Sequence, residues 1–183
     1  MAEVVAPAQI VAVLLVVMAL HVAPPGEAVR WAALTVLFAS LLPMGYVVYQ
    51  VRRRRLTDHH VRVRRQRRVP MLVAIGCTAL CLSLLAVLGA PRQLVALAAA
   101  GVAGLLVTFA VTLAWKVSMH VATLAGAVTI VAIVFGPQWL PLLLLVVLVG
   151  WARVVTGDHS AIQVAAGAVI GSGIAASVYL LLR

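Results

Sequence analysis

The chain alternates between long apolar segments and short polar ones. A hydrocarbon core of about 30 Å requires roughly 20 helical residues, with about 17 as a lower limit. Seven segments reach this limit: 7–23, 31–51, 71–88, 93–114, 117–135, 139–155 and 160–182. Proline and glycine separate several of them, as at residues 24–26 and 89–91, where they favour turns. The pattern predicts an all-α, polytopic membrane helix bundle of six to seven transmembrane helices, with residues 1–183 forming a single membrane domain.

The composition agrees with this pattern and excludes a soluble globular protein. Hydrophobic residues make up 65% of the 183 residues and charged residues only 10%, and the mean hydropathy is +1.18. Soluble domains are about 25% charged. Arg greatly outnumbers Lys, and Ala and Val are abundant. This usage is typical of a GC-rich bacterial genome, so we expect the protein in a bacterial cytoplasmic membrane.

The basic residues are concentrated in one block. The formal net charge is +10, and nine arginines lie between Arg52 and Arg68, whereas the loops that hold Arg30 and Arg92 carry one each. The positive-inside rule therefore places the loop 52–69 and the N-terminus in the cytoplasm, where the loop would attract anionic lipids. Nucleic-acid-binding proteins carry such blocks on soluble modules, so nucleic acid is not an expected partner.

Ionisable residues at the ends of the spans form three clusters, in segments 58–70, 116–120 and 153–163. An even number of spans separates each cluster from the next, so all three should reach the same membrane face. Candidate residues in the last two clusters are Lys116, Ser118, His120, Arg153 and His159. Guanidinium, ammonium and hydroxyl groups suit a phosphate, and two histidines could divide the roles of nucleophile and general acid. No carboxylate cluster indicates a metal site.

These residues resemble the signatures of the type-2 phosphatidic acid phosphatase superfamily. Ser118-x-His120 is similar to its second signature, Pro-Ser-Gly-His, and Arg153-x5-His159-x3-Gln163 to its third, Ser-Arg-x5-His-x3-Asp. The first signature, Lys-x6-Arg-Pro, is matched only loosely by Arg64-x2-Arg67-x2-Pro70; the segment Arg55-x6-Arg62 has the spacing but lacks the proline. The resemblance covers residues 58–171.

The resemblance implies a role for each residue. His159 would attack the phosphate and form a phosphohistidine, and His120 would protonate the departing alcohol. The phosphate oxygens would be held by Lys116, Ser118, Arg153 and one or two of Arg64, Arg67 and Arg68. Neither a metal nor a cofactor is expected.

Gln163 stands where the superfamily has Asp. His159 and Gln163 are one helical turn apart on the same face, so Gln163 can accept a hydrogen bond from the imidazole but adds no charge. Asp158 is predicted to be the N-cap of the last span. Gly167 and Gly171 continue the same stripe and predict close helix packing that presents His159.

The sequence thus predicts a membrane phosphatase that hydrolyses lipid phosphate monoesters or diphosphates, of polyprenyl or diacylglycerol type, at the cytoplasmic interface. The alternative is a catalytically weak or inactive lipid-phosphate-binding member, a scaffold or an anion carrier. Gln163 and the imperfect first signature favour this alternative, whereas the two histidines and the spacing of Arg153 and His159 oppose it.

Overall fold

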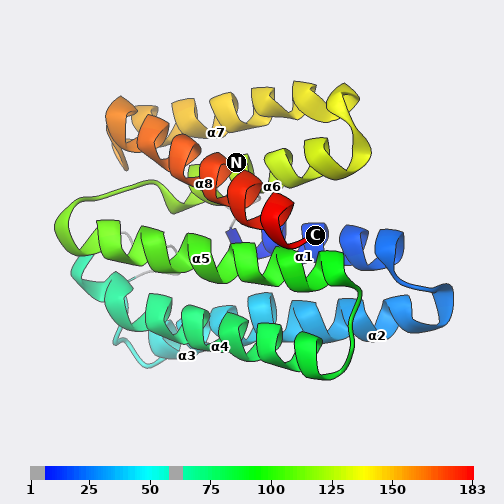
Figure 1. Cartoon of the computed structure of the whole chain (residues 1–183). Helices are drawn as coiled ribbons and strands as arrows, with labels where there is room; N and C mark the ends of the chain where they lie inside the picture. The colour runs from blue at the N-terminus through cyan, green and yellow to red at the C-terminus, as the bar shows by residue number, and fades with distance from the viewer. Residues whose placement is uncertain (1–6, 58–63) are drawn as a thin grey trace.

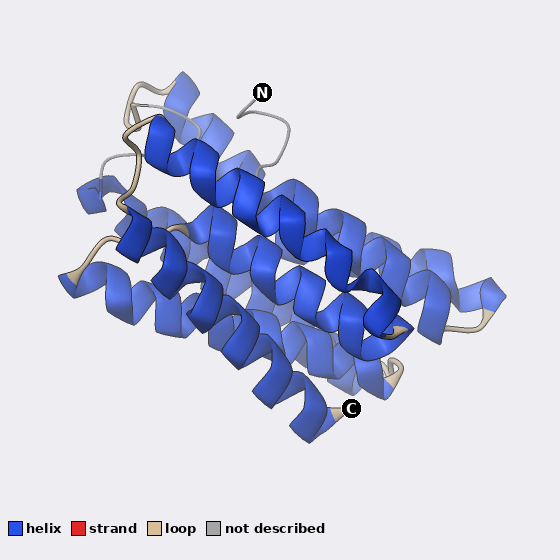
Figure 2. Cartoon of the chain, turned by 90° about the horizontal axis from the view of Figure 1, so that it is seen from above, coloured by secondary structure: helices blue, strands red, loops and turns tan. Residues whose placement is uncertain are grey.

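A computed structural model describes residues 7–57 and 64–183 of the chain. These residues form helices joined by short loops, and no strand occurs among them (Figure 2). The elements in chain order are α1 (Pro7–Val22), α2 (Pro25–Val36), η1 (Leu37–Leu41), α3 (Leu42–Arg52), η2 (Arg64–Arg67), α4 (Arg68–Val87), α5 (Arg92–Ala114), α6 (Met119–Phe135), η3 (Pro137–Leu142), α7 (Leu143–Val155) and α8 (Ala161–Leu182). The prediction of an all-α membrane bundle is confirmed.

Five helices are long and apolar enough to cross a membrane: Pro25–Arg52, Arg68–Val87, Arg92–Ala114, Pro137–Val155 and Ala161–Leu182. The first of these is continuous through α2, η1 and α3, and η1 is a single π-helical turn within it. The helices α1 and α6 are apolar but shorter. Together these helices account for all seven predicted segments.

The start of α6 differs from the prediction. The apolar segment was expected to be helical from residue 117, but Trp115 and Ser118 have extended backbone and the helix begins at Met119. The Ser118 amide donates a hydrogen bond to the Gln163 carbonyl, with an N···O distance of 3.3 Å. This contact with α8 takes the place of a first helical turn.

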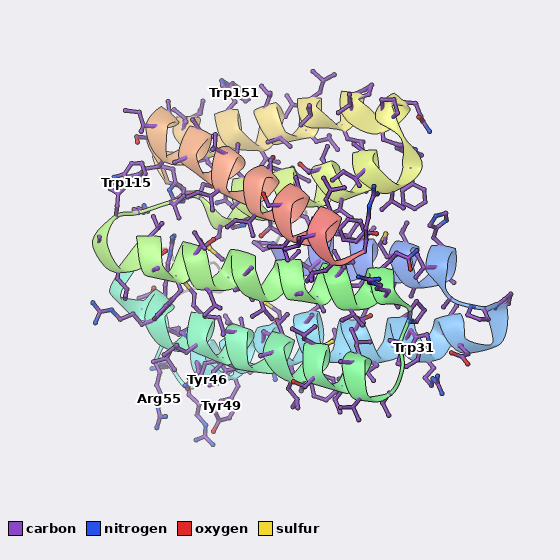
Figure 3. All side chains as sticks on the ribbon, in the orientation of Figure 1. Trp31, Tyr46, Tyr49, Arg55, Trp115 and Trp151 are labelled. Carbon is purple, nitrogen blue, oxygen red and sulfur yellow. The ribbon has the colours of Figure 1, made fainter. Side chains whose placement is uncertain are left out.

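The connections alternate between the two ends of the bundle. The loops that follow α3, α5 and α7 gather at one end, and those that follow α1, α4 and α6 at the other (Figure 1). We call the first end, which carries Arg52–Arg55, Lys116 and Arg153, the basic end. Figure 3 shows Trp115 at this end and Trp31 toward the opposite one; Trp115 is exposed and Trp31 is buried.

The helices α6 and α8 cross in close contact. A Cβ atom on Gly167 would lie 2.8 Å from the Ser118 carbonyl oxygen, and one on Gly171 would collide with the backbone of Ala122. Only glycine allows this approach, which confirms the predicted packing of both glycines. The crossing fixes the start of α8 directly against the start of α6.

Candidate active site

Three segments far apart in the sequence meet at the basic end. Arg67 Nη1 donates a hydrogen bond to the Val117 carbonyl oxygen at 3.4 Å, and Lys116 Nζ donates to the Asp158 carbonyl oxygen. These contacts join the end of η2, the extended segment 115–118 before α6 and the turn between α7 and α8. The three predicted clusters therefore form one site, although residues 58–63 of the first cluster lie outside the described part of the chain.

A tight turn after α7 brings Arg153 and His159 together. Gly157 adopts φ +71°, a left-handed conformation that glycine reaches at little steric cost. The chain then folds back, and the His159 amide donates to the Arg153 carbonyl at 3.1 Å. Both residues are buried, with 6% of the surface of Arg153 and 8% of that of His159 exposed. The spacing of six residues thus reflects this turn rather than a continuous helix.

Asp158 does not cap α8, so that prediction was wrong. Its carboxylate accepts hydrogen bonds from Arg153 Nη1 at 2.9 Å and from Thr156 Oγ1 at 3.1 Å. The helix begins at Ala161, which makes Ser160 the N-cap. Asp158 lies inside the turn, where its carboxylate pairs with the Arg153 guanidinium.

Ser160 and Gln163 form a capping box at the start of α8. The backbone N–H of Gln163 donates to Ser160 Oγ at 3.4 Å, and the backbone N–H of Ser160 donates to the side-chain oxygen Oε1 of Gln163 at 3.2 Å. The spacing Ser-x-x-Gln is a known signal for this motif, so Ser160 was a residue that sequence reasoning could have found. Because the Ser160 N–H needs an acceptor, the side-chain atom of Gln163 that faces it must be the oxygen.

Gln163 Oε1 also lies 3.2 Å from His159 Nδ1, which is the predicted hydrogen bond. Because an amide oxygen can only accept, Nδ1 must carry the hydrogen. The lone pair of the neutral imidazole is then on Nε2. Gln163 therefore determines both the tautomer and the orientation of His159.

The surroundings of His159 favour its neutral form. The pKa of His159 is lowered from 6.5 to about 4, first by burial and then by the positive charges of Lys116, Arg67 and Arg153, while the hydrogen bond that His159 donates to Gln163 acts in the opposite direction. The imidazole is therefore unprotonated at neutral pH. A neutral imidazole beside three cations is suited to meet an anionic phosphate.

His120 and His159 line the same cavity, of about 350 Å³, together with Arg67. His120 lies in the first turn of α6 and is buried. Ser118 is also buried, and its Oγ has no hydrogen-bond partner among the described residues. An unpartnered hydroxyl next to this site can still donate to a bound anion.

The remaining predicted phosphate ligands differ in position. Lys116 and Arg153 lie beside His159, where both contact Asp158, but they do not line the cavity. Arg68 is exposed at the start of α4. The backbone of Arg64 belongs to η2, and its side chain lies outside the described structure. Of the two arginines from the first cluster whose side chains the structure describes, Arg67 lines the cavity and Arg68 does not.

The described residues contain no group of three or more His, Cys, Asp or Glu side chains that could hold a metal ion.

Comparison of the chain with protein-family models, curated proteins and solved structures finds no match. The case for a function therefore rests on the chemistry of the site.

Proposed function

We propose that this protein is a metal-independent phosphatase that acts on lipid phosphates through a phosphohistidine intermediate. One observation carries the proposal: the imidazoles of His120 and His159 and the guanidinium of Arg67 line one cavity at the basic end of a membrane bundle. The resemblance of the three segments to the superfamily signatures supports the same chemistry.

The reaction begins with His159. Its Nε2 lone pair attacks phosphorus, a P–N bond forms, and the bond from phosphorus to the alcohol oxygen breaks. The electron pair leaves with that oxygen, which takes a proton from His120. Arg67 stabilises the charge on the phosphoryl oxygens from within the cavity, and Lys116 and Arg153 do so from beside it.

Water completes the cycle. His120, now neutral, accepts a proton from the water that attacks the phosphohistidine, the P–N bond breaks, and the electron pair returns to Nε2 of His159. Inorganic phosphate is released. The Gln163 oxygen holds the Nδ1 hydrogen throughout, but it provides no charge to stabilise the imidazolium character that develops.

A second candidate function is phosphate binding with little or no turnover. The ion pair between Arg153 and Asp158 favours it, because this guanidinium is already engaged by a carboxylate. The neutral Gln163 favours it as well. Turnover distinguishes the two candidates directly.

We further propose that the site lies at the cytoplasmic face of a bacterial cytoplasmic membrane. The nine arginines of the basic loop support this orientation. Anionic lipids would bind at the same loop and hold it at the membrane surface.

The decisive experiment is phosphate release by the purified protein in detergent with EDTA, with lipid phosphates as substrates. His159→Ala should abolish turnover together with an acid-labile phosphoenzyme. His120→Ala should slow cleavage of an alkyl phosphate far more than cleavage of nitrophenyl phosphate, whose leaving oxygen hardly needs a proton.

His21→Ala is the matched control, since His21 packs against Phe135 away from the site, with ring centroids 4.6 Å apart. Full activity of His159→Ala would end the assignment. Equal losses of both substrates in His120→Ala would remove only its role as the acid. Tight phosphate binding without turnover in the unmodified protein would establish the second candidate.

A further inference from the structure

The cavity at the catalytic histidines extends deep into the bundle. It is lined by Arg67, the N-cap of α4, and along α4 by Met71, Ala74, Thr78 and Cys81. From Arg67 to Cys81 the helix rises by about 21 Å, at 1.5 Å per residue. This depth is roughly two thirds of a hydrocarbon core of about 30 Å. The cavity is therefore elongated, and we call it the channel; it leads from the proposed phosphate site at His120 and His159 toward the opposite leaflet.

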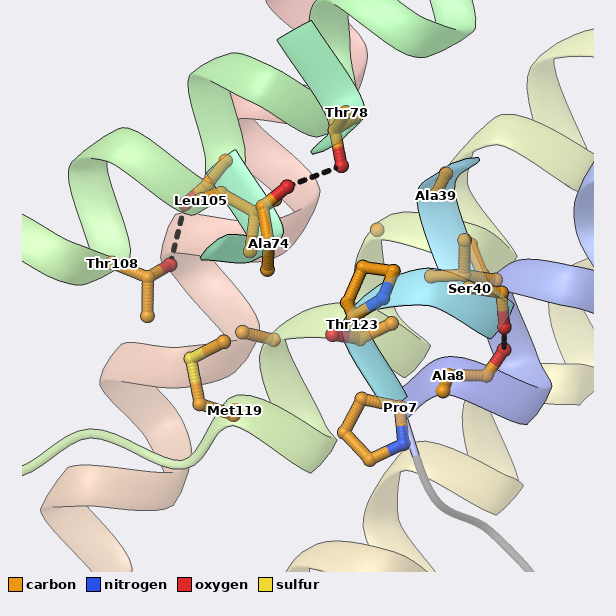
Figure 4. Close-up of a pocket in the computed structure, with 18 of the residues that line it drawn as sticks. Pro7, Ala8, Ala39, Ser40, Ala74, Thr78, Leu105, Thr108, Met119 and Thr123 are labelled. Atoms are coloured by element: carbon orange, nitrogen blue, oxygen red, sulfur yellow. Dashed lines mark hydrogen bonds between the residues drawn. The ribbon is translucent and has the colours of Figure 1, made fainter. Parts of the chain in front are cut away.

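Most of the wall of this channel is apolar, and three of its four hydroxyl side chains bond to the backbone, the fourth being that of Thr123. Thr78 Oγ1 donates to the Ala74 carbonyl at 2.8 Å, Thr108 Oγ1 to Gly104 at 2.6 Å, and Ser40 Oγ to Ala8 at 2.6 Å. Figure 4 shows these bonds directed back onto the backbone around the cavity. A polar ligand such as a sugar would find few free partners there, so the wall suits hydrocarbon.

Small side chains on three helices leave the volume of the channel open. Ala74, Gly101, Gly104, Gly126 and Ala127 line the channel on α4, α5 and α6. A Cβ atom on Gly104 would meet no atom within 4 Å. A side chain added at this lining position therefore meets no clash at its Cβ, and we expect a larger one to narrow the channel.

We infer that the channel binds the phosphate-proximal part of one hydrocarbon chain, so that the substrate is a single-chain lipid phosphate rather than a diacyl one. The inference rests on the proposed function, because the phosphate must lie at His159 while its chain enters the channel. Two features carry it: the cations and imidazoles at the mouth of an otherwise apolar channel, and its volume.

The volume sets the number of chains. About 350 Å³ is at the lower end of the roughly 300–1,000 Å³ typical of ligand pockets. A lipid chain gains little by moving from the bilayer into an equally apolar protein. Selection between lipids must therefore come from how well their chains fit the channel. In a diacyl lipid, the second chain would have to remain outside the channel or overpack it.

The test compares four phosphates in detergent: hexadecyl, farnesyl, dipalmitoylglycerol and butyl. The first two should be turned over with a kcat/KM about tenfold or more above that of the diacyl lipid. Gly104→Leu should lower the ratio of hexadecyl to butyl phosphate turnover by about tenfold. Gly76→Leu is the matched control, because Gly76 is exposed on α4, outside the channel, and is also free of atoms within 4 Å of a Cβ; it should leave the ratio unchanged.

Binding is measured separately with a hexadecanol that carries a photoreactive diazirine. Its cross-links should map to α4, α5 and α6 around the channel and should decrease in Gly104→Leu but not in Gly76→Leu. Equal turnover of single-chain and diacyl lipids, or a ratio unaffected by Gly104→Leu, would overturn the inference even if the protein is a phosphatase. If no phosphate is released from any substrate, butyl phosphate included, the proposed function fails; the cross-links then decide whether the channel binds a chain.

Discussion

Arg153 Nη1 lies 2.9 Å from the Asp158 carboxylate, and only 7% and 15% of the two side chains are exposed. The carboxylate therefore occupies a guanidinium that the superfamily resemblance assigns to phosphate. A bound phosphate must share Arg153 with Asp158 or displace it. If the site binds phosphate as proposed, Asp158 would compete with the substrate for Arg153.

Asp158→Asn should strengthen the binding of vanadate, a phosphate analogue, by roughly threefold or more, because it removes a negative charge beside the anion. Vanadate affinity is read from inhibition of phosphate release. Glu27→Gln is the control, since it removes the same charge from an exposed pair with Arg30 at the opposite end. Weaker vanadate binding in Asp158→Asn would mean that Asp158 positions Arg153 rather than competing for it.

Gln163→Glu should raise the rate of phosphoenzyme formation by about three- to tenfold. Glu has the shape of Gln, keeps the capping box with Ser160 and places a negative charge against Nδ1 of His159, which raises the pKa and basicity of the imidazole. Rapid-quench measurement of the phosphoenzyme gives this rate. Gln163→Met, which can form neither hydrogen bond, should be slower than the unmodified protein, and a Glu variant slower than Met would contradict the role of this contact.

The imidazole of His159 should titrate near pH 4. Its pKa lies well below 6.5 because burial and the cations around it disfavour the protonated form. Protonation is then negligible at pH 7 and is complete only below the lowered pKa. NMR of the histidine-labelled protein should show one imidazole resonance, absent from His159→Ala, with its midpoint near pH 4, and a midpoint at or above 6.5 would refute this environment.

Gly171→Ala should destabilise the bundle by about 1–3 kcal/mol, as overpacking does. The added methyl group would collide with the Ala122 backbone and force α6 and α8 apart. Gly173→Ala lies on the same helix with no atom within 4 Å of its Cβ, and it should be neutral or stabilising by up to about 1 kcal/mol. Thermal unfolding in detergent compares the two, and equal stabilities would show that the crossing is looser than described.

The orientation predicts the location of reporter fusions. Fusions after Arg55 and after Lys116 should report cytoplasm, and a fusion after Arg183 should report the opposite side. Alkaline phosphatase and green fluorescent protein reporters read the two sides independently. An extracytoplasmic reporter at Arg55 would reverse the proposed orientation and change the pool of lipids that the site can reach.

Much of the fold follows from hydropathy alone. Span lengths and Pro or Gly breaks predict the seven apolar helices, because the membrane requires every backbone polar group to be satisfied within its own helix. Hydropathy does not predict where α6 begins. That boundary depends on a hydrogen bond between Ser118 and Gln163, which joins positions far apart in the chain.

The site was predictable to a similar degree. The even number of spans between the clusters predicts that they meet at one end of the bundle. The contact between Gln163 and His159 was predicted from helical spacing, but His159 precedes the N-cap Ser160, and the capping box is what directs Gln163 Oε1 toward it. The partner of Asp158 was not predictable, because it depends on the left-handed turn at Gly157, which folds the carboxylate back onto Arg153. The choice of Arg67 over Arg68 likewise follows from how η2 leads into α4, and the charge pattern does not distinguish the two.

The π turn η1 changes how the long helix Pro25–Arg52 can vary. Before it, buried residues follow an α-helical spacing, at Trp31 and Thr35, and after it the inward face resumes at Ser40 and Met44. The step of five residues from Thr35 to Ser40 matches one π turn. Deletion of a single residue in this turn would restore a regular α-helix in which Thr35 and Ser40 are four positions apart and still share one face. Insertion of one more residue would instead rotate the rest of α3 by about 100° and turn its channel-lining side chains outward. A one-residue deletion should therefore be tolerated in this turn far better than a one-residue insertion.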